Sequence, residues 1–248
     1  MGYSSVLMKR TIVALVLVIG IVPATAAAQS SIVSQIAGDK VATESLYFSL
    51  KFGLNFSYLT GTTETGRTGG FNIGISATIK LTERLSLVPE ITPFIRKGVS
   101  KIPFELTGDP ALDIYFVDLT ASELALSYID IPVLAMYRLG RFHLGAGPYV
   151  SFLTDATERF RAELPTGQEL SLKSEVTDRY KRTDCGLVVE ASWTIAKPRR
   201  GMGLVFHVRY QHGLTDVFRR YSGPLDVLPP GPARNSVIEA YLSFPFVH

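Results

Sequence analysis

Residues 46–58, LYFSLKFGLNFSY, alternate between large apolar side chains and side chains that are mostly small, polar or charged. A repeat of two residues is the repeat of a β-strand, whose successive side chains point to opposite faces. The segment is thirteen residues long, whereas an ordinary strand has about five or six. A strand that crosses a bilayer at a tilt needs roughly nine to eleven residues. Length and pattern together predict a membrane-spanning strand, provided that the pattern recurs.

The alternation does recur, in seven further segments. Connections of about two to six residues follow the second, fourth and sixth segments, and longer connections follow the first, third, fifth and seventh. An even number of strands with short turns at one end and long loops at the other is typical of outer-membrane barrels, whose short turns face the periplasm. The sequence therefore predicts an all-β fold, an eight-stranded antiparallel up-and-down transmembrane β-barrel with short periplasmic turns and long extracellular loops. Its predicted strands are residues 46–58, 70–81, 85–96, 127–139, 142–153, 183–195, 202–214 and 236–247.

The two longest early connections are predicted to be mainly loops. Residues 97–122 contain Pro103 and Pro110, and one stretch within them, 113–119, fits a short strand above the membrane. Residues 154–182 form the longest and most highly charged connection, with charges of both signs. We expect a solvated loop that faces lipopolysaccharide. Binding of a specific extracellular receptor by this loop is the alternative.

The direction in which the apolar face points distinguishes two kinds of eight-stranded barrel. In a soluble lipocalin-like carrier the apolar set points inward around a small ligand. Here the opposite set is dominated by Gly, Ser, Thr and Asn, without the dense Lys and Glu cover of a water-facing exterior. The apolar set is nearly uninterrupted, as a lipid-facing band must be, because a charge at the bilayer midplane costs about 2–4 kcal/mol. We therefore predict that the apolar face meets lipid, with the lipocalin-like arrangement as the alternative.

Aromatic residues near the strand ends fit this orientation. Membrane barrels carry two aromatic girdles where amphipathic rings meet the headgroups. The alternative is that these rings are ordinary core residues at strand ends. The group near the short turns is Phe48, Tyr137, Phe142, Trp193, Phe244 and Phe246. The group near the long loops is Phe56, Tyr58, Phe71, Phe152 and Tyr210.

The opposite face then lines the lumen and includes acids and bases in similar number. Buried charges persist only when they are paired and hydrogen-bonded, and an eight-stranded barrel is just wide enough to be filled by its own side chains. We predict an interior held together by ion pairs, without an open pore. The predicted lumen residues are Lys51, Asn55, Glu90, Arg96, Asp130, Arg138, His143, Glu190, His207, Arg209, Gln211 and Glu239.

Four prolines fall inside predicted strands: Pro89, Pro93, Pro132 and Pro148. A proline lacks the N–H group and so removes one hydrogen bond from the ladder between strands. We expect β-bulges at these positions.

The N-terminus reads as an export signal. Lys9 and Arg10 precede the uncharged apolar run 12–22, and small residues follow up to Ala28. This order is typical of a cleaved secretory signal peptide, and the run is shorter than the roughly 18–20 residues of a spanning helix, which is the alternative. The predicted organisation is residues 1–28 as signal peptide, 29–45 as a periplasmic N-terminal tail, and 46–248 as the barrel domain.

Charge and cysteine content narrow the function. The formal net charge of +3 falls to +1 when the two cations of the signal peptide are removed, so the charge gives no indication of a nucleic-acid partner. Cys185 is the sole cysteine, which excludes an intramolecular disulfide and a thiolate metal cluster.

From residue 46 onward the sequence resembles the outer membrane protein β-barrel domain family of Bacteroidetes and relatives, often called PorT-like. The resemblance implies an outer-membrane location and the barrel fold, and it leaves the activity open. The motifs that carry it are KFGLNFS at 51–57, GFNIG at 70–74, LVPE at 87–90, YIDIPVL at 128–134, GAGPYV at 145–150, DCGL at 184–187 and RYQHGLT at 209–215.

Some outer-membrane barrels are proteases or lipid-modifying enzymes with a base and an acid at the outer rim. His212, Asp184 and Asp216 are the residues that fit this description, because all three fall near the long-loop end. A base and an acid within reach of each other are necessary for such chemistry, but no neighbouring serine accompanies them. His143 and His207 are predicted to be hydrogen-bond partners in the lumen.

We therefore predict a protein of the cell outer membrane that is not an enzyme, with no catalytic, cofactor-binding or metal residues and no cofactor. Its role is structural or unassigned, with surface binding through the long loops, and a rim enzyme is the alternative. The expected partners are outer-membrane lipid, lipopolysaccharide and, during insertion, the barrel-assembly machinery, with no nucleic acid. The protein is expected to be a monomer.

Overall fold

The computed structural model describes residues 45–61, 66–102, 110–114, 122–163, 166–197, 201–219 and 232–247. The predicted signal peptide and all of the predicted tail except Ser45 lie outside these residues, as does most of the predicted short strand 113–119. The segment 110–114 instead contains the four-residue helix α3 (Pro110–Asp113). No helix in the described ranges has both the length and the apolarity needed to cross a bilayer.

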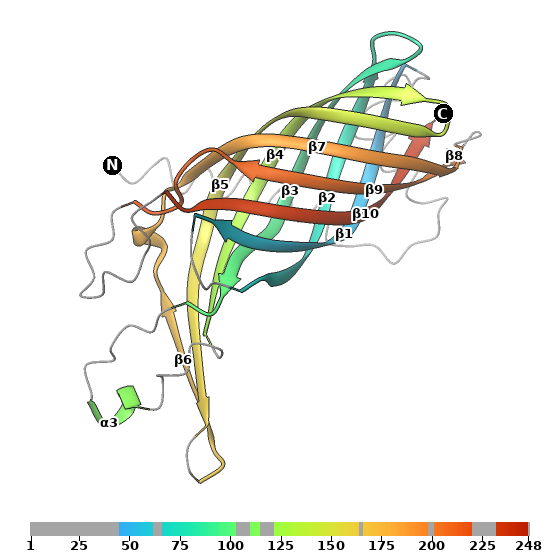
Figure 1. Ribbon diagram of the computed structural model, residues 1–248. Coiled ribbons are helices and arrows are strands. Elements are labelled where there is room, and N and C mark those ends of the chain that lie inside the picture. The colour runs from blue at the N-terminus through green and yellow to red at the C-terminus, as the bar shows by residue number, and fades with distance from the viewer. Residues whose placement is uncertain are drawn as a thin grey trace, which may run out of the picture. The chain divides into compact units, whose positions relative to one another are not determined.

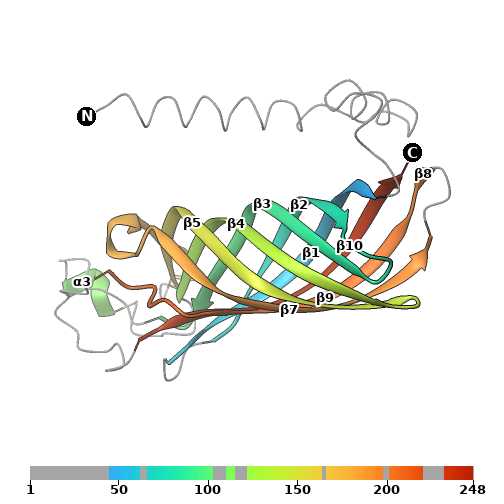
Figure 2. The ribbon, with the colours of Figure 1, turned by 90° about the horizontal axis from the view of Figure 1, so that it is seen from above.

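Eight long strands form a closed antiparallel barrel, as the sequence predicted (Figures 1 and 2). Each strand pairs with the next in chain order, and the last pairs with the first, from Phe48 opposite Phe246 to Thr60 opposite Arg234. A short strand, β8 (Gly201–Met202), precedes the seventh and pairs with the end of the eighth. The eight are β1 (Leu46–Thr60), β2 (Thr68–Lys80), β3 (Leu85–Ser100), β4 (Ser122–Leu139), β5 (Phe142–Glu163), β7 (Thr183–Ala196), β9 (Leu204–Gly213) and β10 (Arg234–Val247).

The apolar face points outward, as predicted. Leu54 and Phe56 on β1 are 56% and 53% exposed, whereas Asn55 between them is fully buried inside the barrel. Leu144 and Leu187 on the opposite side of the barrel are exposed to a similar degree. A lipocalin-like carrier would have these side chains inside, so that alternative is wrong.

The predicted aromatic residues lie on the outward face. Phe142 and Trp193 are paired across β5 and β7, and their rings stack with centroids 5.6 Å apart. Both side chains are about half exposed. They lie next to a short turn, where rings at a membrane interface are expected.

Pro93 is the one proline of the four at which the predicted bulge occurs. The register of β3 shifts at this point against both neighbours, between Ile91 and Phe94 toward β2 and between Thr92 and Ile95 toward β4. The extra residue inverts the alternation, because faces alternate with a period of two. Phe94 is consequently 60% exposed and Ile95 is buried, the reverse of the prediction.

The other three prolines keep the register of the ladder. Pro89 lies opposite Val133, Pro132 opposite Tyr149, and Pro148 opposite Leu187, without a shift at these pairs. The expectation of bulges at these positions is wrong.

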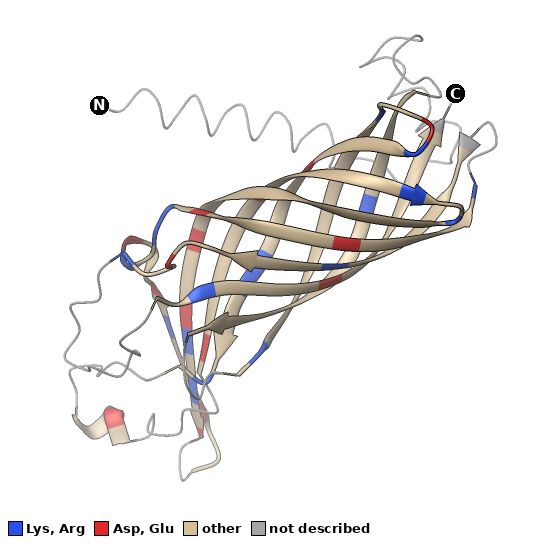
Figure 3. Cartoon of the chain, turned by 45° about the horizontal axis from the view of Figure 1, so that its top comes forward, with Lys and Arg blue, Asp and Glu red and all other residues tan. Residues whose placement is uncertain are grey.

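The connection 154–182, predicted to be a loop, is mostly a β-hairpin. β5 continues to Glu163 and pairs with β6 (Glu169–Glu175), which leads to the short helix η3 (Thr177–Arg179). The hairpin extends beyond the barrel wall and carries charges of both signs (Figures 1 and 3). A register shift against Ser127 and Tyr128 opens this extension. The sequence does not indicate these strands, because charged residues conceal the alternation.

The interior differs in character along the barrel axis. At the long-loop end it is apolar, because the base of the hairpin and inward residues of five strands pack together there. A second, smaller apolar group near the other end consists of Val88, Leu134, Met136, Tyr149 and Val188. The main group is Leu59, Ile95, Val99, Ile102, Leu124, Leu126, Tyr128, Leu153, Ala156, Phe160, Val176, Tyr180, Val217, Ala233 and Val237.

Candidate functional site

A chain of ion pairs crosses the lumen at mid-height. Arg209 on β9 lies 2.7 Å from the Oε2 atom of Glu90 on β3 and 2.5 Å from that of Glu190 on β7. Lys51 on β1 also contacts Glu90 Oε2, at 2.5 Å. All four side chains are at least nine-tenths buried. Because strands β3 and β9 are on opposite sides of the ring, this chain ties one wall to the other, as the sequence predicted for the lumen residues.

Hydrogen bonds connect this chain to further lumen residues. His207 places Nδ1 2.8 Å from Glu190 Oε1 and Nε2 2.7 Å from Ser243 Oγ. The hydroxyl of Tyr241 donates to Glu190 and accepts from Arg209, and its ring lies 4.0 Å below the Lys51 ammonium. Glycine at position 53 leaves space for Tyr241, because an added Cβ would lie 2.3 Å from the tyrosine Cβ.

A second polar group lies nearer the long-loop end, centred on Lys97. Its ammonium is fully buried, 2.9 Å from Asp130 Oδ2 and 3.0 Å from the hydroxyl of Ser151. It also lies 4.7 Å from the ring centroid of Tyr149, whose hydroxyl donates to Asp184. The prediction had placed Lys97 in a loop, because the bulge at Pro93 was needed to bring its side chain inward.

Arg96 is the predicted lumen residue that the same bulge displaces. Ile95 and Lys97 take the inward positions, and Arg96 between them pairs with Glu123 at 2.8 Å in a partly exposed position. The prediction that Arg96 faces the lumen is wrong for this reason.

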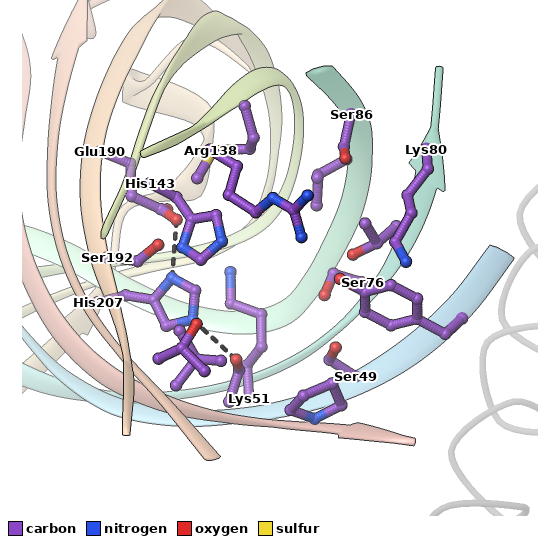
Figure 4. A pocket seen from close by; sticks show the side chains of 18 of the residues that line it. Ser49, Lys51, Ser76, Lys80, Ser86, Arg138, His143, Glu190, Ser192 and His207 are labelled. Carbon is purple, nitrogen blue, oxygen red and sulfur yellow. Dashed lines mark hydrogen bonds and ion pairs between the residues drawn. The ribbon is translucent and has the colours of Figure 1, made fainter. Parts of the chain in front are cut away.

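The short-turn end of the lumen contains a cavity of about 380 Å³. Its floor is the ion-pair chain of Lys51, Glu90 and Glu190, and its mouth lies among the short turns. Arg138 and His143 project into it from neighbouring strands (Figure 4). The wall is rich in hydroxyl groups, contributed by residues that include Ser49, Ser76, Ser86, Ser192, Thr194 and Ser243.

The structure gives each of the three residues considered for a rim enzyme different hydrogen-bond partners. His212 Nδ1 lies 3.2 Å from Ser236 Oγ, but neither aspartate contacts the imidazole. Asp184 accepts from Thr215, Tyr149 and Asn235 inside the barrel. Asp216 accepts backbone N–H groups, at 3.1 Å from Ala233.

The structure also gives no indication of a metal centre in the ranges it describes. Within them, no group of three or more His, Cys, Asp or Glu side chains is arranged to hold a metal ion. Cys185 is exposed on the outward face.

The sequence profile of the outer membrane protein beta-barrel domain family matches residues 28–219. The chain belongs to this family. It is an outer-membrane β-barrel, as the resemblance implied. A comparison with curated protein sequences gave no match.

A comparison with solved structures matched several outer-membrane proteins over most of the chain. Neisserial surface protein A is 13% identical, with 81% of this chain and 96% of that chain covered at a TM-score of 0.38. The attachment invasion locus protein Ail of Yersinia pestis is 11% identical, with 81% and 97% covered at 0.37. CarO of Acinetobacter baumannii is 9% identical, with 77% and 96% covered at 0.37. The family assignment rests on the sequence profile and the closed barrel.

Proposed function

We propose that the protein is a surface-binding barrel with a lumen closed to solutes, acting through the hairpin of β5 and β6 at its extracellular end. The observation that carries this proposal is the difference between the lumen and the hairpin. Buried ion pairs and the apolar group fill the lumen, whereas the hairpin exposes charged side chains beyond it.

Like charges face each other at two places on the outer face of the hairpin, and of these four side chains Glu169 also lies 3.9 Å from Arg161. Arg159 lies directly opposite Lys173, and Glu163 lies opposite Glu169. Like charges facing each other across two strands are destabilising. The opposite face of the hairpin, with Leu172, packs against the apolar group at the barrel end. The two cations that face each other, Arg159 and Lys173, favour a partner with acidic groups.

Membrane lipid and lipopolysaccharide are the proposed surroundings of the barrel wall. A polar group suited to the headgroup level lies at its long-loop end, where the Tyr210 hydroxyl is 3.3 Å from His212 Nδ1 and Arg67 lies 5.6 Å from the ring centroid of Tyr58. Aromatic and basic side chains are favoured at this depth. The barrel-assembly machinery is the proposed partner during insertion, and the protein is proposed to be a monomer without enzymatic activity.

We further infer that residues 1–28 are a cleaved signal peptide and that the protein is a PorT-like member of the family, of the kind found in Bacteroidetes. Support for the first is the basic, apolar and small-residue order of the N-terminus. Support for the second is the set of seven motifs in the same order along the chain.

Binding of an acidic polymer tests the proposed function. Cells that display the wild-type protein are expected to retain dextran sulfate, and neutral dextran serves as the reference. The double substitution Arg159→Gln and Lys173→Gln should reduce retention several-fold. Arg84→Gln and Arg141→Gln, in the short turns at the other end, form the matched control with the same change in charge. Equal retention by the hairpin variant and the wild type would contradict the proposal.

A further inference from the structure

The cavity at the short-turn end has the dimensions of a ligand site. Its volume of about 380 Å³ lies within the range of roughly 300–1,000 Å³ typical of small-molecule pockets. The ion-pair chain closes it on one side. On the other side it opens among the turns, beside Glu83, Gly140 and Lys197. A ligand would enter from the periplasm.

The acids of the cavity are already neutralised within the protein. Glu90 is paired with Lys51 and Arg209, and Glu190 is paired with Arg209 and His207. These interactions are short and buried, so the floor offers little attraction to a cation.

The cations near the mouth are not neutralised in this way. Lys80, Arg138 and Lys197 line the cavity, and none of them takes part in the ion pairs found among the described residues. Glu83 is the acid that remains at the mouth. The cavity therefore has an excess of positive charge over the groups that its own walls can pair.

Arg138 and His143 are the two groups placed to hold an anion. They face each other across β4 and β5, and both project into the cavity in Figure 4. The Nδ1 atom of His143 is buried and makes no hydrogen bond within the described part of the chain, although buried polar atoms are normally satisfied. An oxyanion beside Arg138 would accept from its guanidinium fork, which binds carboxylate and phosphate through two parallel hydrogen bonds. A rotation of the imidazole would bring His143 Nδ1 to the same oxyanion.

We propose that this cavity binds a small organic anion, a carboxylate or a phosphate ester, through Arg138 and His143. The surrounding hydroxyls, among them Ser76, Ser86 and Ser192, supply hydrogen bonds to the rest of the molecule. The site faces the periplasm and is independent of the hairpin and of the surface-binding role. It adds a periplasmic ligand to a barrel whose lumen does not conduct.

Calorimetric titration of the purified, detergent-solubilised protein tests the site, with inorganic phosphate and succinate as separate probes against sodium chloride of equal ionic strength. At least one probe should give saturable binding, and the stronger of the two identifies the class of anion. Arg138→Gln should weaken that binding about tenfold or more, because a hydrogen bond to a charged group is worth about 1.5–3 kcal/mol. Arg138→Lys keeps the charge and loses the fork. Its affinity should fall between the affinities of the wild type and of Arg138→Gln.

Arg84→Gln is the matched control. Arg84 belongs to a short turn at the same end of the barrel, but its side chain contacts the outward Tyr137 at 3.5 Å and does not line the cavity. The affinity of the Arg84→Gln variant for the anion should stay within about twofold of the wild-type affinity. His143→Leu provides a second variant and should weaken binding several-fold. Absence of saturable binding for both probes, or an equal loss in Arg84→Gln and Arg138→Gln, would overturn the proposal.

Discussion

Arg209 Nη2 lies 2.7 Å from Glu90 Oε2, although the two residues belong to strands on opposite sides of the barrel. A contact of this kind requires the long arginine side chain to span the lumen. The same guanidinium also bonds to Glu190 on a neighbouring strand. Arg209 therefore joins three strands across the lumen at mid-height.

Removal of this arginine should destabilise the barrel severely. Arg209→Met removes the guanidinium that Glu90 and Glu190 share, and Glu90 keeps only Lys51 as an ion-pair partner. Breaking a buried ion pair costs about 3–5 kcal/mol. The temperature at which the compact, fast-migrating form disappears on an unboiled gel should fall by many degrees. The double variant that also carries Glu190→Gln should recover part of this loss, because Lys51 and Glu90 still form their ion pair. A single variant that melts with the wild type would contradict the assigned pairing.

Lys97 and Asp130 should be energetically coupled. Lys97→Met leaves Asp130 without its ion pair, and Asp130→Asn leaves the ammonium with only Asp184, at 4.0 Å. Each single change should therefore be destabilising. The double variant should cost less than the sum of the two, with an interaction energy of about 0.5–3 kcal/mol. Urea-induced unfolding of the four proteins in detergent measures this cycle. Additive effects would show that Lys97 is not oriented as described.

A charge on the outward face should be costly only within lipid. Leu144 is 53% exposed on the barrel wall, and Leu144→Arg should destabilise the protein by up to about 2–4 kcal/mol, depending on its depth in the bilayer. The control is Gln168→Arg, an exposed position in the turn of the hairpin outside the barrel wall, where we expect little change. The free energy of unfolding in lipid vesicles distinguishes the two variants. Equal stability of both variants would mean that the Leu144 face meets water.

Gly53 should not tolerate a side chain. An added Cβ would lie 2.3 Å from the Cβ of Tyr241, and overpacking of this kind typically costs about 1–3 kcal/mol. Gly69→Ala on the neighbouring strand β2 is the matched control, because its Cβ would meet Phe56 at an ordinary 3.7 Å. The two variants are compared by their yield of heat-modifiable protein after refolding. A Gly53→Ala variant as stable as Gly69→Ala would contradict the close approach.

The barrel wall could be predicted from the sequence because a lipid-facing strand repeats a single requirement. Every second residue of β1, from Leu46 to Tyr58, must be apolar, and no partner needs to be known for this pattern to be read. All eight strands followed from it. The hairpin that extends β5 beyond the barrel wall could not be predicted in this way, because its charged residues obey no such requirement.

The pairing inside the barrel could not be predicted in the same way. Sequence placed Glu90 and Arg209 in the lumen, but which acid meets which base depends on the tilt and stagger of the strands. One extra residue at Pro93 reversed the faces that follow it, so that Lys97 entered the core and Arg96 left it. Proline indicated a bulge at Pro93, but it indicated one equally at Pro89, Pro132 and Pro148, where the register is unchanged.

Electrical recording in planar lipid bilayers tests the closed lumen most directly. Wild-type protein inserted into the bilayer is predicted to show no sustained conductance steps, because Arg209, Glu90 and Glu190 block the channel and the apolar group fills its outer end. Stable steps in the wild type, unchanged by Arg209→Met, would contradict a lumen closed by this ion-pair chain.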